Sequence, residues 1–335
     1  VLFRSRTFQA EDEIAGITSA IGAAFAGNIA VTATSGPGVA LKTEALGLAI
    51  TTELPMVLIN VQRGGPSTGL PTKTEQSDLN QAMFGRNGES PLVVLAAATP
   101  SDCFNMAYEA CRIALKYMIP VILLSDGYIA NGSEPWKIPA LNSLMDIETA
   151  LTINKKGYAP FNHDKSTLAR PWALPGTPEL EHRVGGLEKW DVTGHVSYDP
   201  DNHQKMVELR QQKVDVIANE IPKTNPFGNP QGDLLVLGWG GTYGAIRSAV
   251  ESAQNKGYAV SHLHLRYLNP LPNNLGDILV KFQNILIPEL NMGQLSMIIR
   301  SKFLVDTISL NKVQGKPFNK NDILCKINNI LKAIN

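Results

Sequence analysis

Apolar positions in the first 130 residues follow two different periods. Ile14, Ile17, Ile21 and Phe25 recur every three or four residues, which predicts a helix over residues 12–26. Short runs rich in β-branched residues follow it, each closed by a turn signal and most separated by a helical stretch; they span residues 29–34, 56–61, 92–96 and 121–125. Such an alternation is typical of a parallel α/β sheet.

Residues 101–118 predict a further helix, with Ser101 placed to cap it. Its expected apolar stripe consists of Phe104, Ala107, Cys111, Ala114, Leu115 and Met118. On this prediction Cys103 and Cys111 are core residues.

The pattern changes after residue 130. Residues 131–201 have little periodicity and are rich in Pro, Gly, Trp and His, which is typical of a functional arm or linker. A charged helix over 202–219 and a breaker-rich linker over 222–230 follow. A second α/β unit then shows strands at 233–237, 259–265 and 285–287, and helices at 243–256 and from near Gly293.

These changes divide the chain into three parts. We expect a first domain over residues 1–130, an irregular arm, helix and linker over 131–230, and a smaller domain over 231–335.

The charge of the chain limits its partners. Its 335 residues include 30 Lys and Arg and 30 Asp and Glu, without a block of like charges, so we expect no nucleic acid and no anionic membrane among its main ligands. Charged residues make up 18% of the chain, against about 25% in typical proteins. This deficit predicts that a partner covers part of the surface.

Two further features concern the setting of the protein. The three cysteines lack the spacing of a zinc or iron–sulfur site, so we expect no metal cluster held by this chain alone. No apolar run approaches the ~18 residues that span a bilayer, and we expect a cytoplasmic protein. Residues 1–5, VLFRS, lack a methionine; we expect them to be a translated sequencing-adapter scar, with natural residues missing before them.

Glu13 is the first candidate for chemistry. It ends the acidic run at 11–13, where a helix start alone would favour carboxylates. The small and apolar residues at 14–17 could bury its carboxyl group, as a group that shares a proton with a ring nitrogen requires. From these residues alone, a structural and a catalytic role both stay open.

The other candidates lie in turns that follow strands. Residues 34–38, which include Ser35, Gly36 and Pro37, join a strand to a helix and leave backbone N–H groups free for a ligand, although a plain tight turn explains them equally well. Arg63 opens a long loop at the carboxyl edge of the sheet, where α/β proteins bind ligands. It could hold a carboxylate by two parallel hydrogen bonds, or simply be solvated.

The turn at 238–244, GWGGTYG, lies between a strand and a helix, as a dinucleotide-binding turn does. It departs from G-x-G-x-x-G at Tyr243, and no acid follows the next strand where a ribose would need one. We therefore expect a structural turn rather than an NAD site. His262 and His264 alternate along that next strand and are expected to be core or interface groups.

Longer motifs occur in order along the whole chain. In the first half they are QAEDEIA at 9–15, TATSGPG at 32–38, TEALGLA at 43–49, QRGGPSTGLPT at 62–72 and QSDL at 76–79. In the second half they are LVLGWG at 235–240, HLHLRYLNP at 262–270, PELNMGQ at 288–294 and LNKVQGKPF at 310–318. Together they resemble the α subunit of 2-oxoacid:ferredoxin oxidoreductases, most closely the 2-oxoglutarate branch.

The resemblance implies a two-domain α/β fold, in which a thiamine diphosphate pyrimidine-binding sheet precedes a transketolase C-terminal-like domain. It implies that Glu13 hydrogen-bonds N1′ of the pyrimidine, and that Arg63 grips the substrate carboxylate. Ser35, Gly36 and Pro37 would contact the cofactor. In this family the diphosphate, its Mg²⁺ and a 4Fe–4S cluster belong to a β subunit, and coenzyme A and ferredoxin are the other partners.

The implied reaction is the reversible oxidative decarboxylation of 2-oxoglutarate to succinyl-coenzyme A and carbon dioxide. Pyruvate and branched-chain 2-oxo acids stay open as substrates, because Arg63 would recognise the carboxylate that all of them share. A thiamine enzyme without ferredoxin and a non-catalytic scaffold stay open as functions. The Tyr-Pro-Ile-Thr-Pro-like segment that family members carry before the glutamate is absent here, so we expect this chain as it stands to be unable to turn over.

Overall fold

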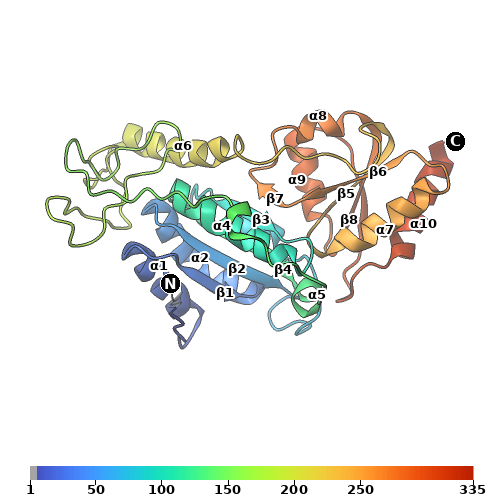
Figure 1. The fold of residues 1–335 in the computed structure, drawn as a ribbon, viewed down its shortest axis with the longest axis horizontal. Coiled ribbons are helices and arrows are strands. Elements are labelled where there is room, and N and C mark those ends of the chain that lie inside the picture. The colour runs from blue at the N-terminus through green and yellow to red at the C-terminus, as the bar shows by residue number, and fades with distance from the viewer. Residues whose placement is uncertain (1–5, 335) are drawn as a thin grey trace.

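The computed structural model describes residues 6–334, so the five residues expected to be adapter sequence lie outside it. Two sheets lie side by side along the long axis of the molecule, and the irregular region after residue 131 extends beyond the first of them, at the left of Figure 1. Most of the strands are parallel. The alternating pattern therefore predicted the fold class correctly.

The first sheet has the strand order β1-β2-β4-β3-β7. Its strands are β1 (Val31–Thr34), β2 (Met56–Gln62), β3 (Val93–Ala96), β4 (Pro120–Asp126) and β7 (Tyr267–Asn269). The helices of this part are α1 (Glu13–Phe25), α2 (Gly36–Thr51), α3 (Leu79–Phe84), α4 (Asp102–Tyr117) and α5 (Gly127–Asn131). α1 and α2 pack on one face of the sheet and α4 on the other.

The second sheet has the order β6-β5-β8-β9 and is parallel throughout. Its strands are β5 (Gly232–Trp239), β6 (Val260–Leu265), β8 (Phe282–Glu289) and β9 (Ile308–Asn311). Its helices are η2 (Gly240–Thr242), α7 (Tyr243–Gln254), α8 (Leu275–Leu279), α9 (Gln294–Phe303) and α10 (Lys320–Ile334). α7 and α10 cover one face, and the other face shares a core with the first sheet.

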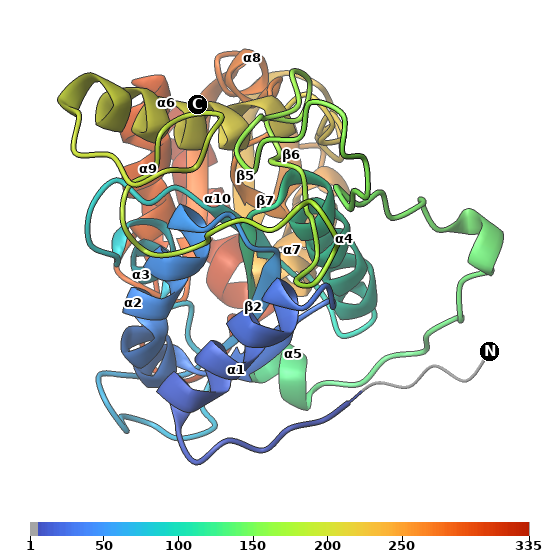
Figure 2. The ribbon, with the colours of Figure 1, turned by 90° about the vertical axis from the view of Figure 1, so that its left-hand side faces the viewer.

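The part of the chain between α5 and β5 contains η1 (Leu141–Ser143) and α6 (Pro200–Ile217). Figure 2 shows the segment after α5 leaving the body and returning to it. α6 packs against α4, and a buried ion pair between Lys213 of α6 and Glu53, just after α2, ties this region to the first sheet. Because both side chains are only 2% exposed, the irregular region is anchored rather than loose.

β7 connects the two halves of the chain. It follows β6 in sequence, yet it pairs antiparallel with β3 at the edge of the first sheet. The division at residue 230 stays a prediction, and the strand pairing shows that the two sheets are not independent bodies.

Two details expected for α4 are wrong. Ser101 makes no side-chain capping bond; instead the Asp102 carboxylate accepts from the Ala98 N–H at 3.0 Å. Phe104 is not in the core stripe, because Met106, Ala110, Ile113 and Tyr117 form the face that packs on the strands. Phe104 lies 37% exposed and contacts Trp136, with ring centroids 5.1 Å apart.

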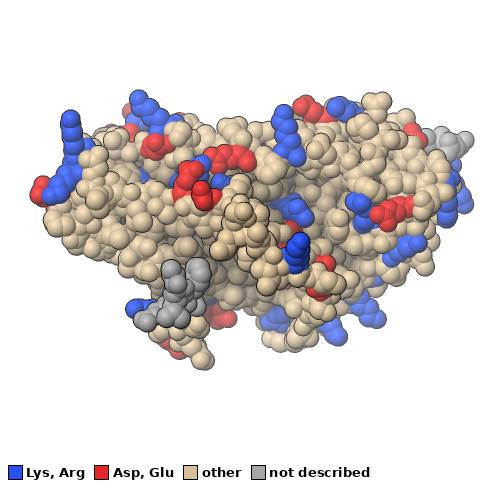
Figure 3. All heavy atoms as spheres, in the orientation of Figure 1, with Lys and Arg blue, Asp and Glu red and all other residues tan. Residues whose placement is uncertain are grey.

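The surface mixes both signs of charge. Figure 3 shows Lys and Arg side chains interspersed with Asp and Glu and separated by wide uncharged areas. No helix in residues 6–334 combines the length and the apolar character that crossing a bilayer requires.

Candidate functional site

Three segments meet at the carboxyl edge of the first sheet: the start of α1, the turn from β1 into α2 and the loop that follows β2. A helix that leads into a parallel strand runs opposite to it, so the start of α1 lies at the edge where β1 ends. Glu13 is the first residue of α1, and Asp12 caps the helix by accepting from the Ala15 N–H at 2.8 Å. The sequence thus places Glu13 beside the turn into α2, as expected.

Glu13 lies half-buried against that turn. A Cβ atom added to Gly38 would come within 2.8 Å of Glu13 Cγ and would overlap the hydroxyl oxygen of Thr34. The absence of a side chain at 38 therefore allows the glutamate to lie across the start of α2. On its other side Glu13 lines a cavity of about 520 Å³ between α1 and β1.

The turn into α2 has the local structure that its sequence predicts. Ser35 occupies the N-cap position, and Pro37 is the second residue of the helix. The Ser35 side chain does not cap α2; its hydroxyl oxygen accepts from Arg63 Nε at 3.2 Å. Gly36 is buried against the carboxyl group of Asp78, where a Cβ would come within 2.7 Å of both oxygens.

Arg63 follows β2 directly and lies half-buried. Its Nη1 donates to the Thr68 carbonyl at 2.5 Å, which fixes the guanidinium plane, while Nη2 has no hydrogen bond within residues 6–334. The Arg63 carbonyl in turn accepts from the Ser77 hydroxyl at 3.1 Å. The structure therefore brings Arg63 and Ser35 together and leaves one terminal nitrogen for a ligand.

Two residues near this site were missed by the sequence analysis. Asp78 is 9% exposed and accepts from Asn60 Nδ2 and the Ser77 hydroxyl, both at 3.0 Å. Burial raises the pKa of Asp78, against the opposing effect of these bonds and of the Arg63 charge. Lys42, on α2, is 2% exposed and contacts the backbone of Glu13.

A signal for Lys42 was present in the sequence. Val39, Ala45, Leu46 and Ala49 form the buried face of α2, and Lys42 falls on the same face. A lysine on an apolar helix face needs a specific partner, because an unpaired charge is costly to bury. Asp78 offered no comparable signal, since its partners come from β2 and from its own loop.

The turn at 238–244 is filled from the first sheet. The Gly241 N–H donates to Asp126 Oδ2 at 3.0 Å, and a Cβ on Gly241 would come within 2.5 Å of the same oxygen. Gln76 Nε2 donates to the Trp239 carbonyl at 2.8 Å. Because these side chains occupy the space where a pyrophosphate would lie, the turn is structural. His262 and His264 pack against each other and against Tyr243, as expected of core groups.

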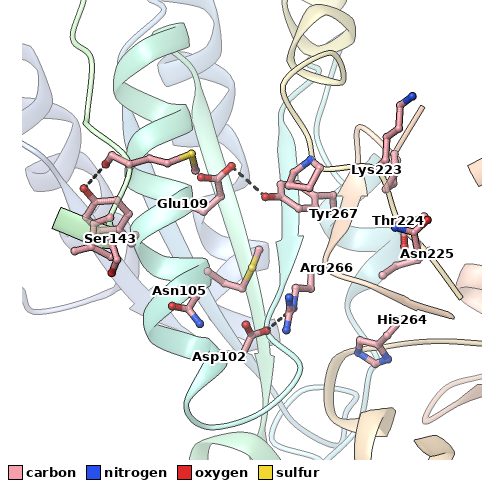
Figure 4. A pocket seen from close by; sticks show the side chains of 17 residues that line it. Asp102, Asn105, Glu109, Ser143, Lys223, Thr224, Asn225, His264, Arg266 and Tyr267 are labelled. Carbon is pink, nitrogen blue, oxygen red and sulfur yellow. Dashed lines mark hydrogen bonds and ion pairs between the residues drawn. The ribbon is translucent and has the colours of Figure 1, made fainter. Parts of the chain in front are cut away.

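A second cavity, of about 470 Å³, opens between α4, the 222–225 linker and the strands β6 and β7 (Figure 4). Arg266 Nε donates to Asp102 Oδ2 at 3.0 Å, and Tyr267 donates to Glu109 at 3.1 Å across this cleft. These contacts link the two halves of the chain. No residue that the sequence analysis selected as a site lines it. Nor does any group of three or more His, Cys, Asp or Glu side chains in residues 6–334 have the placement of a metal site.

Comparison with known proteins places this geometry in context. The family described as pyruvate flavodoxin/ferredoxin oxidoreductase, thiamine diphosphate-binding, matches residues 3–198. The 2-oxoglutarate oxidoreductase subunit KorA of Mycobacterium tuberculosis is 54% identical over 322 residues, which is 96% of this chain and 49% of that protein. The chain thus spans about half the length of this curated relative.

Solved structures show the same similarity. The 2-oxoglutarate:ferredoxin oxidoreductase from Magnetococcus marinus, with 2-oxoglutarate, coenzyme A and succinyl-CoA bound, superposes with a TM-score of 0.91 at 35% identity. The match covers 96% of this chain and 57% of that one. A split-gene transketolase superposes with a TM-score of 0.50 at 10% identity over 94% of this chain and 80% of that one, a likeness of fold alone. The expected pairing of a pyrimidine-binding-type sheet with a transketolase-like domain is confirmed.

Proposed function

Because the chain belongs to the 2-oxoacid:ferredoxin oxidoreductase α subunits, we propose that it provides the pyrimidine-binding half of a thiamine diphosphate enzyme. The reaction is the reversible oxidative decarboxylation of 2-oxoglutarate to succinyl-coenzyme A and carbon dioxide, with electrons passed to ferredoxin. The observation that carries the proposal is the convergence of Glu13, Ser35 and Arg63 on one edge of the first sheet.

The residues at this edge fit an aminopyrimidine ring. Glu13 offers a half-buried carboxyl group beside a cavity, and the glycines at 36 and 38 leave the start of α2 free of side chains. The first N–H groups of α2 have no partner in the preceding turn, as at any helix start. When bound, thiamine diphosphate supplies the nucleophilic carbon that attacks the 2-oxo group.

In this proposal the residues of this chain bind the cofactor and the substrate and orient them for that chemistry. Glu13 would share the proton of its carboxyl group with the ring nitrogen N1′, the contact by which this chain would activate the cofactor. Arg63 binds the substrate carboxylate through Nη2, while Ser35 and Thr68 keep the guanidinium plane fixed. Ser35, Gly36 and Pro37 form the wall of the site that faces the cofactor.

The partner is a β subunit that holds the diphosphate, Mg²⁺ and a 4Fe–4S cluster. Support comes from the edge of the first sheet, since within residues 6–334 β1 pairs with β2 alone. Ile14, Ile29 and Val31 lie there about half exposed, close to Glu13. Apolar side chains of this size gathered at a sheet edge are typical of a surface covered in a complex.

The assay of the complete α chain with its β partner tests the reaction. We expect coenzyme A-dependent reduction of a viologen dye with 2-oxoglutarate, and less with pyruvate or 2-oxoisovalerate run side by side. The named relatives act on 2-oxoglutarate, whereas Arg63 alone recognises the carboxylate common to all three substrates. If pyruvate or 2-oxoisovalerate supported faster dye reduction than 2-oxoglutarate, that oxo acid would be the substrate instead.

Replacing Glu13 by Gln tests the mechanism. The amide keeps the shape but cannot share a proton, so exchange of the cofactor C2 proton, followed by NMR, is expected to fall by roughly two to four orders of magnitude. The control is Glu44→Gln, an exposed glutamate on the neighbouring helix α2, which should leave exchange unchanged. A Glu13→Gln complex that assembles and keeps normal exchange and turnover would support a non-catalytic scaffold instead.

A further inference from the structure

We propose that Lys42 is the positioning residue of Glu13: its ammonium group fixes the first turn of α1 through the Glu13 carbonyl. The inference deepens the proposed function and rests on it, because it assigns Lys42 a role only through Glu13. It concerns how the acid is held in place, and adds no new reaction.

The contacts of Lys42 define this role. Its Nζ donates to the Glu13 carbonyl oxygen at 2.9 Å and to the Thr32 hydroxyl at 3.3 Å, so it joins α1, β1 and α2 at one point. The side chain reaches there along the surface of Gly16, where a Cβ would come within 3.3 Å of Nζ. A residue on α2 thereby fixes the backbone of the residue that begins α1.

The charge of Lys42 has no close counter-charge. Within residues 6–334 the ammonium forms no ion pair and donates to two neutral oxygens. The charged groups around the same cavity are Arg6, Glu11, Asp12 and Glu13. Burial lowers the pKa of Lys42, whereas the charges of Glu13 and Asp12 act to raise it. The ammonium therefore lies at the first turn of α1, beside the acidic residues that begin that helix.

A purely structural lysine would behave differently. If Lys42 only filled space, Lys42→Met would preserve both cofactor affinity and exchange of the cofactor C2 proton. If Lys42 acts on Glu13, loss of its hydrogen bond leaves the Glu13 carbonyl without that partner and loosens the start of α1, so both quantities should fall.

The experiment uses the complete α chain assembled with its β partner. For Lys42→Met we expect the dissociation constant of thiamine diphosphate, measured by fluorescence titration, to rise about tenfold. We expect exchange of the cofactor C2 proton, followed by NMR, to fall about tenfold, and Lys42→Met to cause no further fall in a chain that already carries Glu13→Gln. Lys42→Arg keeps a donor for the Glu13 carbonyl and should keep most of the exchange. The control is Lys256→Met, an exposed lysine beyond α7, which should change neither quantity.

A second variant covers the case in which the Lys42→Met chain fails to assemble. Gly16→Ala places a methyl group 3.3 Å from Nζ, so the ammonium must shift by a few tenths of an ångström while the helix itself is favoured; we expect a smaller fall in C2-proton exchange. Exchange and cofactor affinity both within twofold of wild type, in whichever variant assembles, would overturn the inference. If Glu13→Gln loses C2-proton exchange, the proposed function is supported whichever result the Lys42 variants give.

Discussion

Arg63 shows how much one side chain depends on its neighbours. Two of its three nitrogens are already bound inside the chain, to Ser35 and Thr68, so its orientation is fixed before any substrate arrives. A preorganised guanidinium loses little conformational entropy on binding a carboxylate. For the proposed role, this arrangement favours arginine over a lysine that carries only a positive charge.

Arg63→Lys is therefore expected to weaken substrate binding with a smaller effect on turnover. A lysine cannot bond Ser35, Thr68 and a carboxylate in one plane, so KM for the oxo acid should rise roughly tenfold to a hundredfold, which corresponds to ~1.5–3 kcal/mol for a bond to a charged group. Steady-state kinetics of the α–β complex measure this. Arg247→Lys, on α7 away from the edge, is the matched control. An unchanged KM for the oxo acid would show that Arg63 does not bind the substrate carboxylate.

The sequence predicted where the candidate residues that follow strand ends would lie. Ser35 and Arg63 lie after parallel strands, and that rule alone brought them to one edge. Lys42 and Asp78 act through partners 29 and 18 residues away along the chain, Glu13 and Asn60. Their roles depend on the distance between α1 and α2 and on the path of the loop after β2, which periodicity does not determine.

At the scale of elements, α1 and α2 approach closely at Gly38. Gly38→Ala would place a methyl group against Thr34 and Glu13, so we expect a loss of about 1–3 kcal/mol of stability, together with reduced cofactor affinity. Thermal melting and fluorescence titration of the complex measure the two effects. Gly47→Ala on the same helix has its nearest neighbour at 3.8 Å and should gain ~0.5–1 kcal/mol. Equal behaviour of the two variants would show that the approach of the helices is not tight.

The helices and strands that the sequence analysis gave ranges for were predicted to within a few residues, because each has a clear period, whereas it gave no range for α2, β9 or α10. The errors concern contacts between elements: Phe104 fits the stripe of α4 but meets Trp136 of the irregular region instead. β7 was missed because three residues carry no periodicity, and only its pairing with β3 defines it. Local pattern fixes the elements, and long-range contact decides which face each one buries.

At the scale of the molecule, one loop connects the two sheets. Gln76 donates to the Trp239 carbonyl and accepts from the Leu290 N–H, and Asn291 donates to the Gln76 carbonyl. This loop begins at Arg63 and ends at Asp78. The second sheet therefore supports the loop that carries Arg63, the proposed substrate-binding residue.

Glu289 lies behind this junction and gives it a pH dependence. Its carboxylate is fully buried and accepts from Trp239 Nε1 and from the Leu295 and Ser296 N–H groups at the start of α9. Burial raises the pKa of Glu289 in spite of these bonds. A raised pKa in the folded state means that its stabilising effect is complete below the unfolded pKa, about 4.3, and declines as pH rises through the folded pKa.

Glu289→Gln should therefore cost more stability in mildly acidic solution than at neutral pH. The amide removes the shielded acid, whose stabilising contribution is complete only at low pH, so we expect a loss of about 1–3 kcal/mol there. Thermal melting of the complex between pH 5 and 8 measures the difference. Asp322→Asn is the control, because Lys312 lowers the pKa of Asp322 and both of its states ionise below that range, so its cost should stay constant. A Glu289→Gln cost that grew with pH would mean that Glu289 is ionised and stabilising, and that the junction is held by charge rather than by a shielded acid.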